Sequence, residues 1–314
     1  MIRLGTSDLE VSPLCLGGTV LGWTADEQRS TAVLDAYTEA GGNFLDTADM
    51  YSSWVPGHSG GESEETIGRW MQLRGNRDGL VVATKVGKMP GLQGTSSSVT
   101  ARAVEDSLRR LRTDRIDLYY VHFDDTAVPV EETLSGLDTL VRQGKVRYVG
   151  ASNFTADRLA ESLAASDRNG WVRYVAVQQE YNLLHRTEFE SGMASVLAEH
   201  GLSNVPHTAL AKGFLTGKYR PGLTVDSHRA ADNESRLDAR GLAVLAALDR
   251  IADAHRTTVA AVALAWLAAQ PSTASPIASA RRVEQLADLL PVAELRLTGT
   301  ELESLSAAGS VPAR

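Results

Sequence analysis

The sequence predicts an α/β fold, a closed (β/α)8 barrel of the TIM type preceded by a β-hairpin. Short apolar runs alternate with longer amphipathic segments along the chain, which is typical of a parallel sheet covered by helices. The alternation repeats eight times within 314 residues, and this number favours closure into a barrel over an open sheet. Because barrels of this length commonly fold as one unit, we expect residues 1–314 to form a single domain.

The first residues predict the hairpin. Apolar residues flank the turn-forming segment Gly-Thr-Ser-Asp of residues 5–8, a pattern that indicates two short strands and a turn. We expect this hairpin to precede the barrel and to cover its lower mouth.

Eight short apolar runs are the predicted barrel strands. Several are rich in Val, Ile and Tyr, and they are too short for globular helices. They are residues 14–18, 43–48, 80–85, 116–122, 146–153, 174–178, 205–211 and 274–279. The only cysteine, Cys15, lies in the first run, so we interpret it as a buried strand residue.

Amphipathic segments between these runs are the predicted helices. They are residues 27–40, 63–73, 100–111, 130–143, 156–165 and 188–200. A polar insert, residues 219–237, carries Pro221 and Gly222. It is too polar for a core element, so we predict a long loop over the active-site face.

Composition argues against several classes of partner, although a local basic pocket is compatible with it. The chain has 31 basic and 39 acidic residues, a net charge of −8, which does not favour general nucleic-acid binding. A chain of this size can bury a core without disulfides or metals, and we predict no metal site. The start of the chain lacks the apolar core of a signal peptide, and its longest apolar run, 259–269, is too short to cross a bilayer. We therefore expect a cytoplasmic protein without a membrane partner; its oligomeric state is not determined by the sequence.

Four ionisable side chains occur at consecutive strand ends. The second strand ends in Asp46, and Tyr51 follows five residues later. The third strand ends in Lys85 and the fourth in His122. Since active sites of (β/α)8 barrels form at the carboxyl ends of the strands, we expect these four side chains to converge.

Such a group suits proton transfer to or from a carbonyl or alcohol oxygen. A phenol has a pKa of about 10, and a nearby ammonium lowers it. We therefore predict that Lys85 lowers the pKa of Tyr51, that Asp46 keeps Lys85 charged, and that Tyr51 is the acid in reduction and the base in oxidation. His122 would orient the oxygen, and a bound cofactor would exchange the hydride.

Each of these residues also has an ordinary structural interpretation. Alone, Asp46 would more often be a cap and Tyr51 a loop aromatic. His122 alone would more often be a hydrogen-bonded core histidine. The combination at consecutive strand ends is what favours catalysis.

The segments that carry these residues resemble the aldo-keto reductases. The resemblance rests on NFLDTADMY, GGESEETIG, ATKVG, IDLYYVHFDD, GASNF, VQQEYNLL and LAKGFLTGKY, and so covers essentially the whole chain. It implies the same tetrad, a small carbonyl substrate, and NADP(H) bound without a GxGxxG motif, which the sequence lacks. Within the family it points to a bacterial NADP-dependent branch.

The resemblance also implies the residues that hold the cofactor. Ser152, Asn153 and Gln178 would hold the nicotinamide carboxamide. An ordinary strand-to-helix cap is the alternative for Ser152-Asn153, and it is compatible with that binding role. The other implied positions are Gly18, Thr19, Leu210, Gly213, Thr216, Lys218, Arg229, Gln285 and Asp288. Of these, Lys218 and Arg229 would favour NADP(H), since a guanidinium suits a phosphate dianion.

Three positions depart from the usual family pattern. His207 stands where an aromatic residue usually stacks on the nicotinamide. An imidazole can also stack, but it can titrate near neutral pH, which would make cofactor binding weaker or pH-dependent. Ser279 replaces a common glycine after strand eight, and Leu289 replaces a common asparagine.

The resemblance places the substrate beside Trp54 on one wall, with Phe123 and Asp124 on another. Trp54 could also be ordinary loop packing.

Two rival functions remain open. One is a cofactor-sensing regulatory subunit, since potassium-channel β subunits share the fold and tetrad; the chain's start at the hairpin, without an N-terminal extension, weighs against it. The other is a Schiff-base aldolase that uses Lys85.

Overall fold

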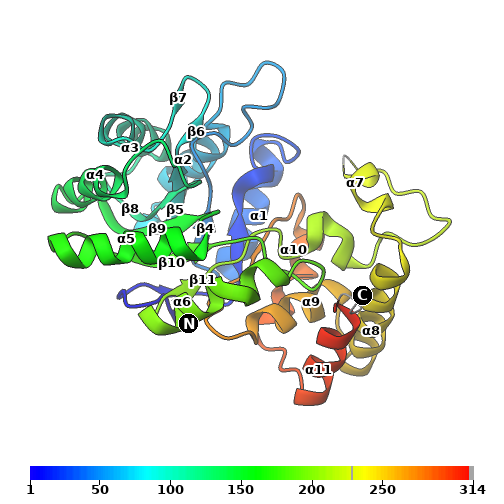
Figure 1. The fold of residues 1–314 in the computed structure, drawn as a ribbon. Coiled ribbons are helices and arrows are strands. Elements are labelled where there is room, and N and C mark those ends of the chain that lie inside the picture. Colours follow the sequence, from blue (N-terminus) through cyan, green and yellow to red (C-terminus); the bar gives the residue numbers. More distant parts are fainter. Residues whose placement is uncertain (228, 311–314) are drawn as a thin grey trace.

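Eight parallel strands form the centre of the computed structural model, which describes residues 1–227 and 229–310 (Figure 1). Their spatial order is β11-β10-β9-β8-β5-β4-β3-β12. They are β3 (Cys15–Gly17), β4 (Phe44–Asp46), β5 (Val81–Val86), β8 (Ile116–Val121), β9 (Val146–Ser152), β10 (Tyr174–Gln178), β11 (Ser203–Asn204) and β12 (Ile277–Ala278). The predicted α/β class is therefore confirmed.

Backbone hydrogen bonds between the regions of the two outermost strands close the sheet. The Asn204 N–H donates to the Ser272 carbonyl at 2.6 Å, and the Ala274 N–H donates to the Asn204 carbonyl at 2.9 Å. Further along, the Ile277 N–H donates to the Pro206 carbonyl at 2.9 Å. These bonds join β11 to the segment that leads into β12, so the strands form the predicted barrel.

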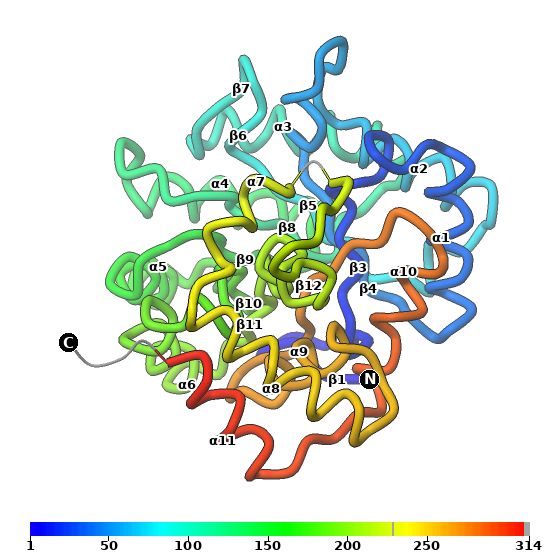
Figure 2. The backbone as a smooth tube through the Cα atoms, turned by 90° about the vertical axis from the view of Figure 1, so that its right-hand side faces the viewer, coloured from blue at the N-terminus to red at the C-terminus, as the bar shows by residue number. Residues whose placement is uncertain are grey.

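Helices surround the barrel (Figure 2). They are α1 (Glu27–Glu39), α2 (Glu62–Arg74), α3 (Ser97–Leu111), α4 (Val130–Arg142), α5 (Ala156–Asn169), α6 (Ala194–His200), α7 (Ala230–Glu234), α8 (Ala239–His255), α9 (Val259–Ala268), α10 (Val283–Ala287) and α11 (Gly299–Ala308). Helices α3, α4 and α5 pack in a row on one side of the strands, and α8, α9 and α11 pack on the other (Figure 1). Among the described residues, every helix falls short of the length and apolarity that a bilayer crossing requires.

Side-chain caps start many of these helices. Asp26 and Thr155 accept hydrogen bonds from backbone N–H groups in the first turns of α1 and α5. Thr298 and Glu301 form a complete capping box at α11. Such caps satisfy N–H groups that have no partner inside the helix, which fixes where each helix begins.

The N-terminal hairpin fills one end of the barrel, as predicted. Strands β1 (Ile2–Arg3) and β2 (Glu10–Val11) pair antiparallel. Their buried neighbours Leu4 and Leu9 belong to the apolar cluster inside the barrel. At the turn, the left-handed Gly5 (φ 53°) lies so close to the barrel that a Cβ atom would be 2.1 Å from the Val175 carbonyl oxygen. The hairpin therefore closes the end of the barrel opposite the strands' carboxyl ends.

Three segments differ from the prediction. Strand β11 spans only Ser203–Asn204, whereas the predicted strand covered residues 205–211. The prediction missed these two residues because they are polar, although both are buried where the barrel closes. The residues that follow turn into a 3-10 helix, Ala211–Thr216. The polar insert is a loop over the cavity, as expected, but it contains the short helix α7.

A second hairpin was not predicted. Strands β6 (Lys88–Met89) and β7 (Leu92–Gln93) pair antiparallel beyond the end of β5. Left-handed glycines stand at both ends, Gly87 (φ 118°) and Gly94 (φ 101°), and the Gly94 N–H donates to the Gly87 carbonyl at 3.0 Å. This hairpin stands at the rim where the site lies.

Candidate active site

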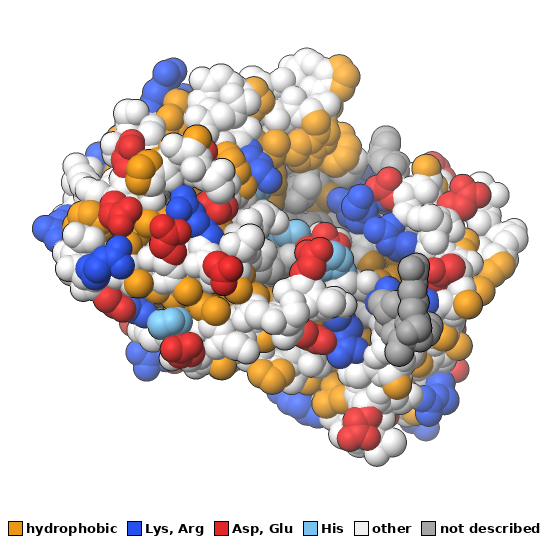
Figure 3. Space-filling view, viewed as in Figure 1, with side chains coloured by type: hydrophobic (Ala, Val, Ile, Leu, Met, Phe, Trp, Pro, Cys, Tyr) orange, Lys and Arg blue, Asp and Glu red, His pale blue; other side chains and the backbone are white. Residues whose placement is uncertain are grey.

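A cavity of about 1160 Å³ opens at the carboxyl ends of the strands. In the space-filling view the same face is hollowed, with histidine side chains inside the hollow (Figure 3). The predicted site residues that line the cavity are Thr19, Asp46, Tyr51, Trp54, His122, Ser152, Asn153, Gln178, His207, Leu210, Gly213, Thr216, Lys218, Arg229, Ser279, Gln285 and Asp288. The cavity thus brings together residues from many parts of the chain.

Lys85 is the centre of the tetrad. Its side chain is completely buried on β5, behind the residues that line the cavity. The ammonium donates hydrogen bonds at 2.7 Å to Asp46 Oδ2 and at 2.9 Å to the Tyr51 hydroxyl oxygen. A third bond, 2.7 Å long, goes to the Thr47 carbonyl oxygen. All three ammonium hydrogens are therefore used.

Tyr51 accepts from Lys85, so its own hydroxyl hydrogen is left for another acceptor. The loop that carries Tyr51 is fixed by the backbone: the Asp49 N–H donates to the Lys85 carbonyl at 3.2 Å, and the Gly61 N–H donates to the Tyr51 carbonyl at 3.2 Å. Tyr51 therefore has a fixed position relative to β5, the strand that carries its ammonium partner.

The prediction that the pKa of Tyr51 is lowered was wrong. Burial raises the pKa of this phenol above its ordinary value, and the opposing charge of Lys85 does not cancel that effect. For Lys85 itself, burial favours the neutral amine, but the charge of Asp46 outweighs burial and raises the pKa of the ammonium. The resting site thus holds a protonated phenol beside a protonated lysine.

The two histidines of the cavity are neutral at physiological pH. Burial, together with the charges of Lys85 and Lys88, lowers the pKa of His122 well below its ordinary value. The same causes lower the pKa of His207 to about 4. Of the two alternatives for His207, titration near neutral pH is therefore contradicted. The rings of His122 and Tyr51 meet edge to face, with centroids 6.2 Å apart.

Amide and hydroxyl groups form a connected network beside the tetrad. Gln178 donates from Nε2 to Asp46 Oδ1 at 2.8 Å, while the Ser152 hydroxyl donates to the Gln178 carbonyl at 2.9 Å. Asn153 has left-handed backbone (φ 57°), and its Oδ1 lies 3.1 Å from Nε2 of His207. These contacts hold the ends of β9 and β10 in register at the cavity.

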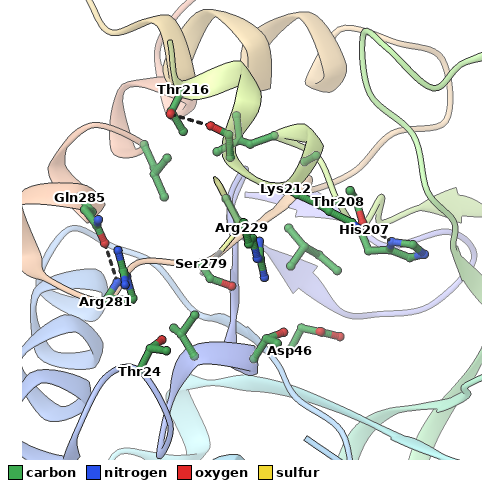
Figure 4. A pocket seen from close by; sticks show the side chains of 18 of the residues that line it. Thr24, Asp46, His207, Thr208, Lys212, Thr216, Arg229, Ser279, Arg281 and Gln285 are labelled. Atoms are coloured by element: carbon green, nitrogen blue, oxygen red, sulfur yellow. Dashed lines mark hydrogen bonds between the residues drawn. The ribbon is translucent and has the colours of Figure 1, made fainter. Parts of the chain in front are cut away.

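The other end of the cavity is rich in basic side chains. Figure 4 shows Arg229, Lys212 and Arg281 around the space, with Thr216 and Gln285 among them. The basic residues that line it there are Lys212, Lys218, Arg229, Arg281 and Arg282. Lys212 forms an ion pair with Asp232 of α7 at 3.1 Å, which joins the long loop to the 3-10 helix. The Arg281 N–H donates to Gln285 Oε1 at 2.9 Å.

The predicted substrate walls are only partly formed. Trp54 lines the cavity, but Phe123 and Asp124 do not. Asp124 accepts a hydrogen bond from Arg158 Nε at 2.8 Å inside a separate small pocket. Gly18 also lies behind the lining, where a Cβ would be 2.7 Å from the Ser63 hydroxyl and 3.0 Å from the Asp46 carbonyl oxygen.

Several lining residues were not found from the sequence. Trp23 meets Trp54 edge to face with ring centroids 5.5 Å apart. Lys88 enters the cavity from the unpredicted hairpin, and Arg281 enters from the loop after β12. Of these residues, only Arg281 could have been found from the sequence, because the pair Arg281-Arg282 follows shortly after a predicted strand end.

Comparisons with known proteins agree with this geometry. The profile described as "Aldo/keto reductase family" matches residues 13–309. An uncharacterised oxidoreductase of Bacillus subtilis is 34% identical, over 96% of this chain and 94% of its own. An aryl-alcohol dehydrogenase [NADP(+)] of Phanerodontia chrysosporium is 31% identical, over 95% and 82%. A probable voltage-gated potassium channel subunit beta of Arabidopsis thaliana is 32% identical, over 90% and 88%.

Proposed function

Because this chain belongs to the aldo/keto reductase family, we propose that it transfers hydride between NADP(H) and a small carbonyl compound or its alcohol. One observation carries the proposal. Lys85 joins Asp46 and Tyr51 at 2.7 and 2.9 Å while the hydroxyl hydrogen of Tyr51 stays available at the cavity. This is the geometry of a general acid with a charged neighbour ready to stabilise its conjugate base.

The cavity residues fit a nicotinamide dinucleotide phosphate. Near the tetrad, the amide groups of Asn153 and Gln178 offer both donors and acceptors, which suits a carboxamide. At the far end, Lys218, Arg229 and Arg281 offer positive charge for phosphates. When bound there, the nicotinamide supplies or accepts the hydride.

Tyr51 is the proton donor and acceptor in this proposal. In reduction its O–H donates to the carbonyl oxygen, and the phenolate that remains is stabilised by the Lys85 ammonium 2.9 Å away. Asp46 holds that ammonium in place and keeps it charged. The reverse sequence, with the phenolate as base, serves oxidation of an alcohol.

His122 orients the substrate in this scheme. Its pKa is far below neutral, so the ring is a neutral hydrogen-bonding group at working pH. It lines the cavity beside Tyr51, where it can direct a carbonyl oxygen toward the phenol.

A Schiff-base aldolase is disfavoured. A nucleophilic amine must be neutral, whereas the three hydrogen bonds of Lys85 use the whole ammonium and its pKa is raised. A cofactor-sensing subunit stays a second candidate, since two relatives bear the name of a channel subunit.

One experiment tests the proposal. A panel of aldehydes and ketones is followed by NADPH absorbance, with NADH assayed in parallel. We expect turnover of at least one carbonyl class and a lower KM for NADPH. Tight NADPH binding without turnover of any compound, in either direction, would favour the sensing subunit.

A further inference from the structure

Aromatic rings form one wall of the catalytic end of the cavity. Trp54 lies edge to face with Tyr51, with ring centroids 6.3 Å apart, and Trp23 packs against Trp54 in the same way. All three residues line the cavity. Trp54 is 44% exposed, and with Trp23 and Tyr51 it forms a cluster of rings rather than a single exposed apolar side chain. A flat aromatic substrate would cover this wall.

Lys88 lies at the same, catalytic end of the cavity. Lys88 is the first residue of the β6–β7 hairpin and lines the cavity. Its Nζ lies 5.6 Å from the ring centroid of Phe123, the residue directly after His122. The neighbouring Met89 packs against Gly60, in the loop that carries Trp54. Lys88 therefore stands between the strand end that bears His122 and the aromatic wall.

The charge of Lys88 is not neutralised by the described residues. No carboxylate among residues 1–227 and 229–310 lies within 4.0 Å of its ammonium. By contrast, Lys85 is paired with Asp46 and Lys212 with Asp232. Partial burial and the charge of Lys85 lower the pKa of Lys88. A bound anion would oppose this effect, because a negative charge stabilises the protonated lysine.

We propose that Lys88 selects aromatic carbonyl substrates that carry a carboxylate, with the ring against Trp23 and Trp54 and the carbonyl at Tyr51. This inference rests on the proposed function and names its substrate class. His122 and His207 are neutral, because the pKa of each is lowered. Among the described residues that line the cavity, Lys88 is therefore the unpaired cation near the tetrad. The other unpaired cations of the lining, Lys218, Arg229 and Arg281, belong to the phosphate end.

The test compares 3- and 4-carboxybenzaldehyde with their neutral carbamoyl analogues. The carbamoyl group has a similar shape and no charge, so the ratio of kcat/KM values isolates recognition of the anion. We expect the wild type to prefer the carboxylates. In Lys88→Met this preference should fall roughly tenfold to hundredfold, the effect of losing one hydrogen bond to a charged group, while turnover of the carbamoyl compounds is kept.

Matched variants separate charge from structure. Lys88→Arg should keep the preference, and Lys88→Glu should reverse it. Lys145→Met removes a lysine that pairs with Glu105 at the opposite end of the barrel, and it should change nothing. Binding of benzoate, followed by tryptophan fluorescence, provides a readout that needs no turnover.

The outcomes distinguish the two proposals. Equal kcat/KM for charged and neutral aldehydes, or an equal loss for both in Lys88→Met, would overturn the role of Lys88 and leave the reductase function standing. Benzoate binding that depends on Lys88, without turnover of any aldehyde, would support the anion site and contradict the proposed reaction. Neither binding nor turnover would reject both.

Discussion

Gln178 and Lys85 share one carboxylate: Gln178 Nε2 lies 2.8 Å from Oδ1 of Asp46, and Lys85 Nζ lies 2.7 Å from Oδ2. The residue proposed to bind the carboxamide is therefore linked directly to the proton-transfer group. With its amide N–H donating to Asp46, Gln178 keeps its carbonyl oxygen free to accept from a ligand. Asp46 thereby couples cofactor position to the orientation of Lys85 and Tyr51.

Tyr51→Phe should abolish most turnover and spare the cofactor site. Removal of a general acid typically costs about 10²–10⁴ in rate, and the phenyl ring keeps its edge contacts with Trp54 and His122. Steady-state kcat and an NADPH fluorescence titration measure the two effects. Tyr148→Phe, whose hydroxyl accepts from the Asp8 N–H near the hairpin, is the control. A Tyr51→Phe variant with near wild-type kcat would refute Tyr51 as the proton donor.

Lys85→Met should destabilise the fold as well as stop catalysis. Both Lys85 and Asp46 are buried, and an unpaired buried charge typically costs about 3–5 kcal/mol. Urea unfolding measures the loss in free energy of unfolding. The double variant Lys85→Met with Asp46→Asn should lose clearly less than the sum of the two single variants. Additive losses would contradict a coupled pair.

His207 should not make cofactor binding pH-dependent between pH 6 and pH 8. Its pKa of about 4 leaves the ring neutral throughout that range. The ratio of NADPH dissociation constants for wild type and His207→Gln should therefore stay constant, since titration of the cofactor phosphate affects both proteins alike. A ratio that changes severalfold near pH 6.5 would show that the ring does titrate there.

The same pKa predicts how acid affects the fold. A lowered histidine pKa means that the folded state resists protonation, so this contribution to stability is present above pH 6.5 and is lost as the pH falls toward 4. Wild type should lose more stability than His207→Gln over that interval, as measured by urea unfolding.

Asp49 should make the fold less stable at higher pH. Its carboxylate is buried with neither oxygen hydrogen-bonded within the described residues. Burial, helped by the charge of Glu64, raises the pKa of Asp49 to about 7. Its contribution to stability is therefore full below about pH 4 and is lost as the pH rises through 7.

The variant Asp49→Asn removes this titration. The difference in free energy of unfolding between Asp49→Asn and wild type should shift in favour of the variant from pH 5 to pH 8. The same substitution at the exposed Asp253 is the control. A difference that stays flat with pH at position 49 would contradict the raised pKa.

Arg229→Ala should weaken NADPH more than NADH. Arg229 lines the phosphate end of the cavity, and one charged hydrogen bond contributes about 1.5–3 kcal/mol. We expect the KM for NADPH to rise about tenfold or more, with little change for NADH. If Arg281→Ala raises the KM for NADPH selectively and Arg229→Ala does not, then Arg281, in the loop after β12, binds the 2′-phosphate instead of Arg229.

The tetrad could be predicted because strand ends are visible in the sequence. A charged residue such as Lys85 at the end of an apolar run is conspicuous, and barrel geometry then brings neighbouring ends together. The pKa of Tyr51 could not be predicted, because its direction depends on how deeply the phenol is buried.

Other features depend on tertiary contacts that leave no local pattern. Ser203 and Asn204 are polar, yet they form the strand that closes the barrel, since the backbone of Asn204 bonds to a segment about 70 residues later in sequence. The position of Lys88 depends on a two-strand hairpin around Pro90-Gly91, which the strand pattern did not predict. Trp23 lies in a loop and reaches the cavity by packing on Trp54.

The N-terminal hairpin closes one end of the barrel, and the cavity opens at the other end. Within the part of the chain that the structure describes, the interior apolar cluster that the hairpin completes includes no residue from the rim segments 51–61, 87–94 or 219–237. These segments border the cavity from outside that cluster, so exchanging their residues other than the proton donor Tyr51 and the buried Tyr219 should alter which compounds are accepted while the interior cluster is kept. New substrate ranges are therefore accessible to this scaffold through loop replacement alone.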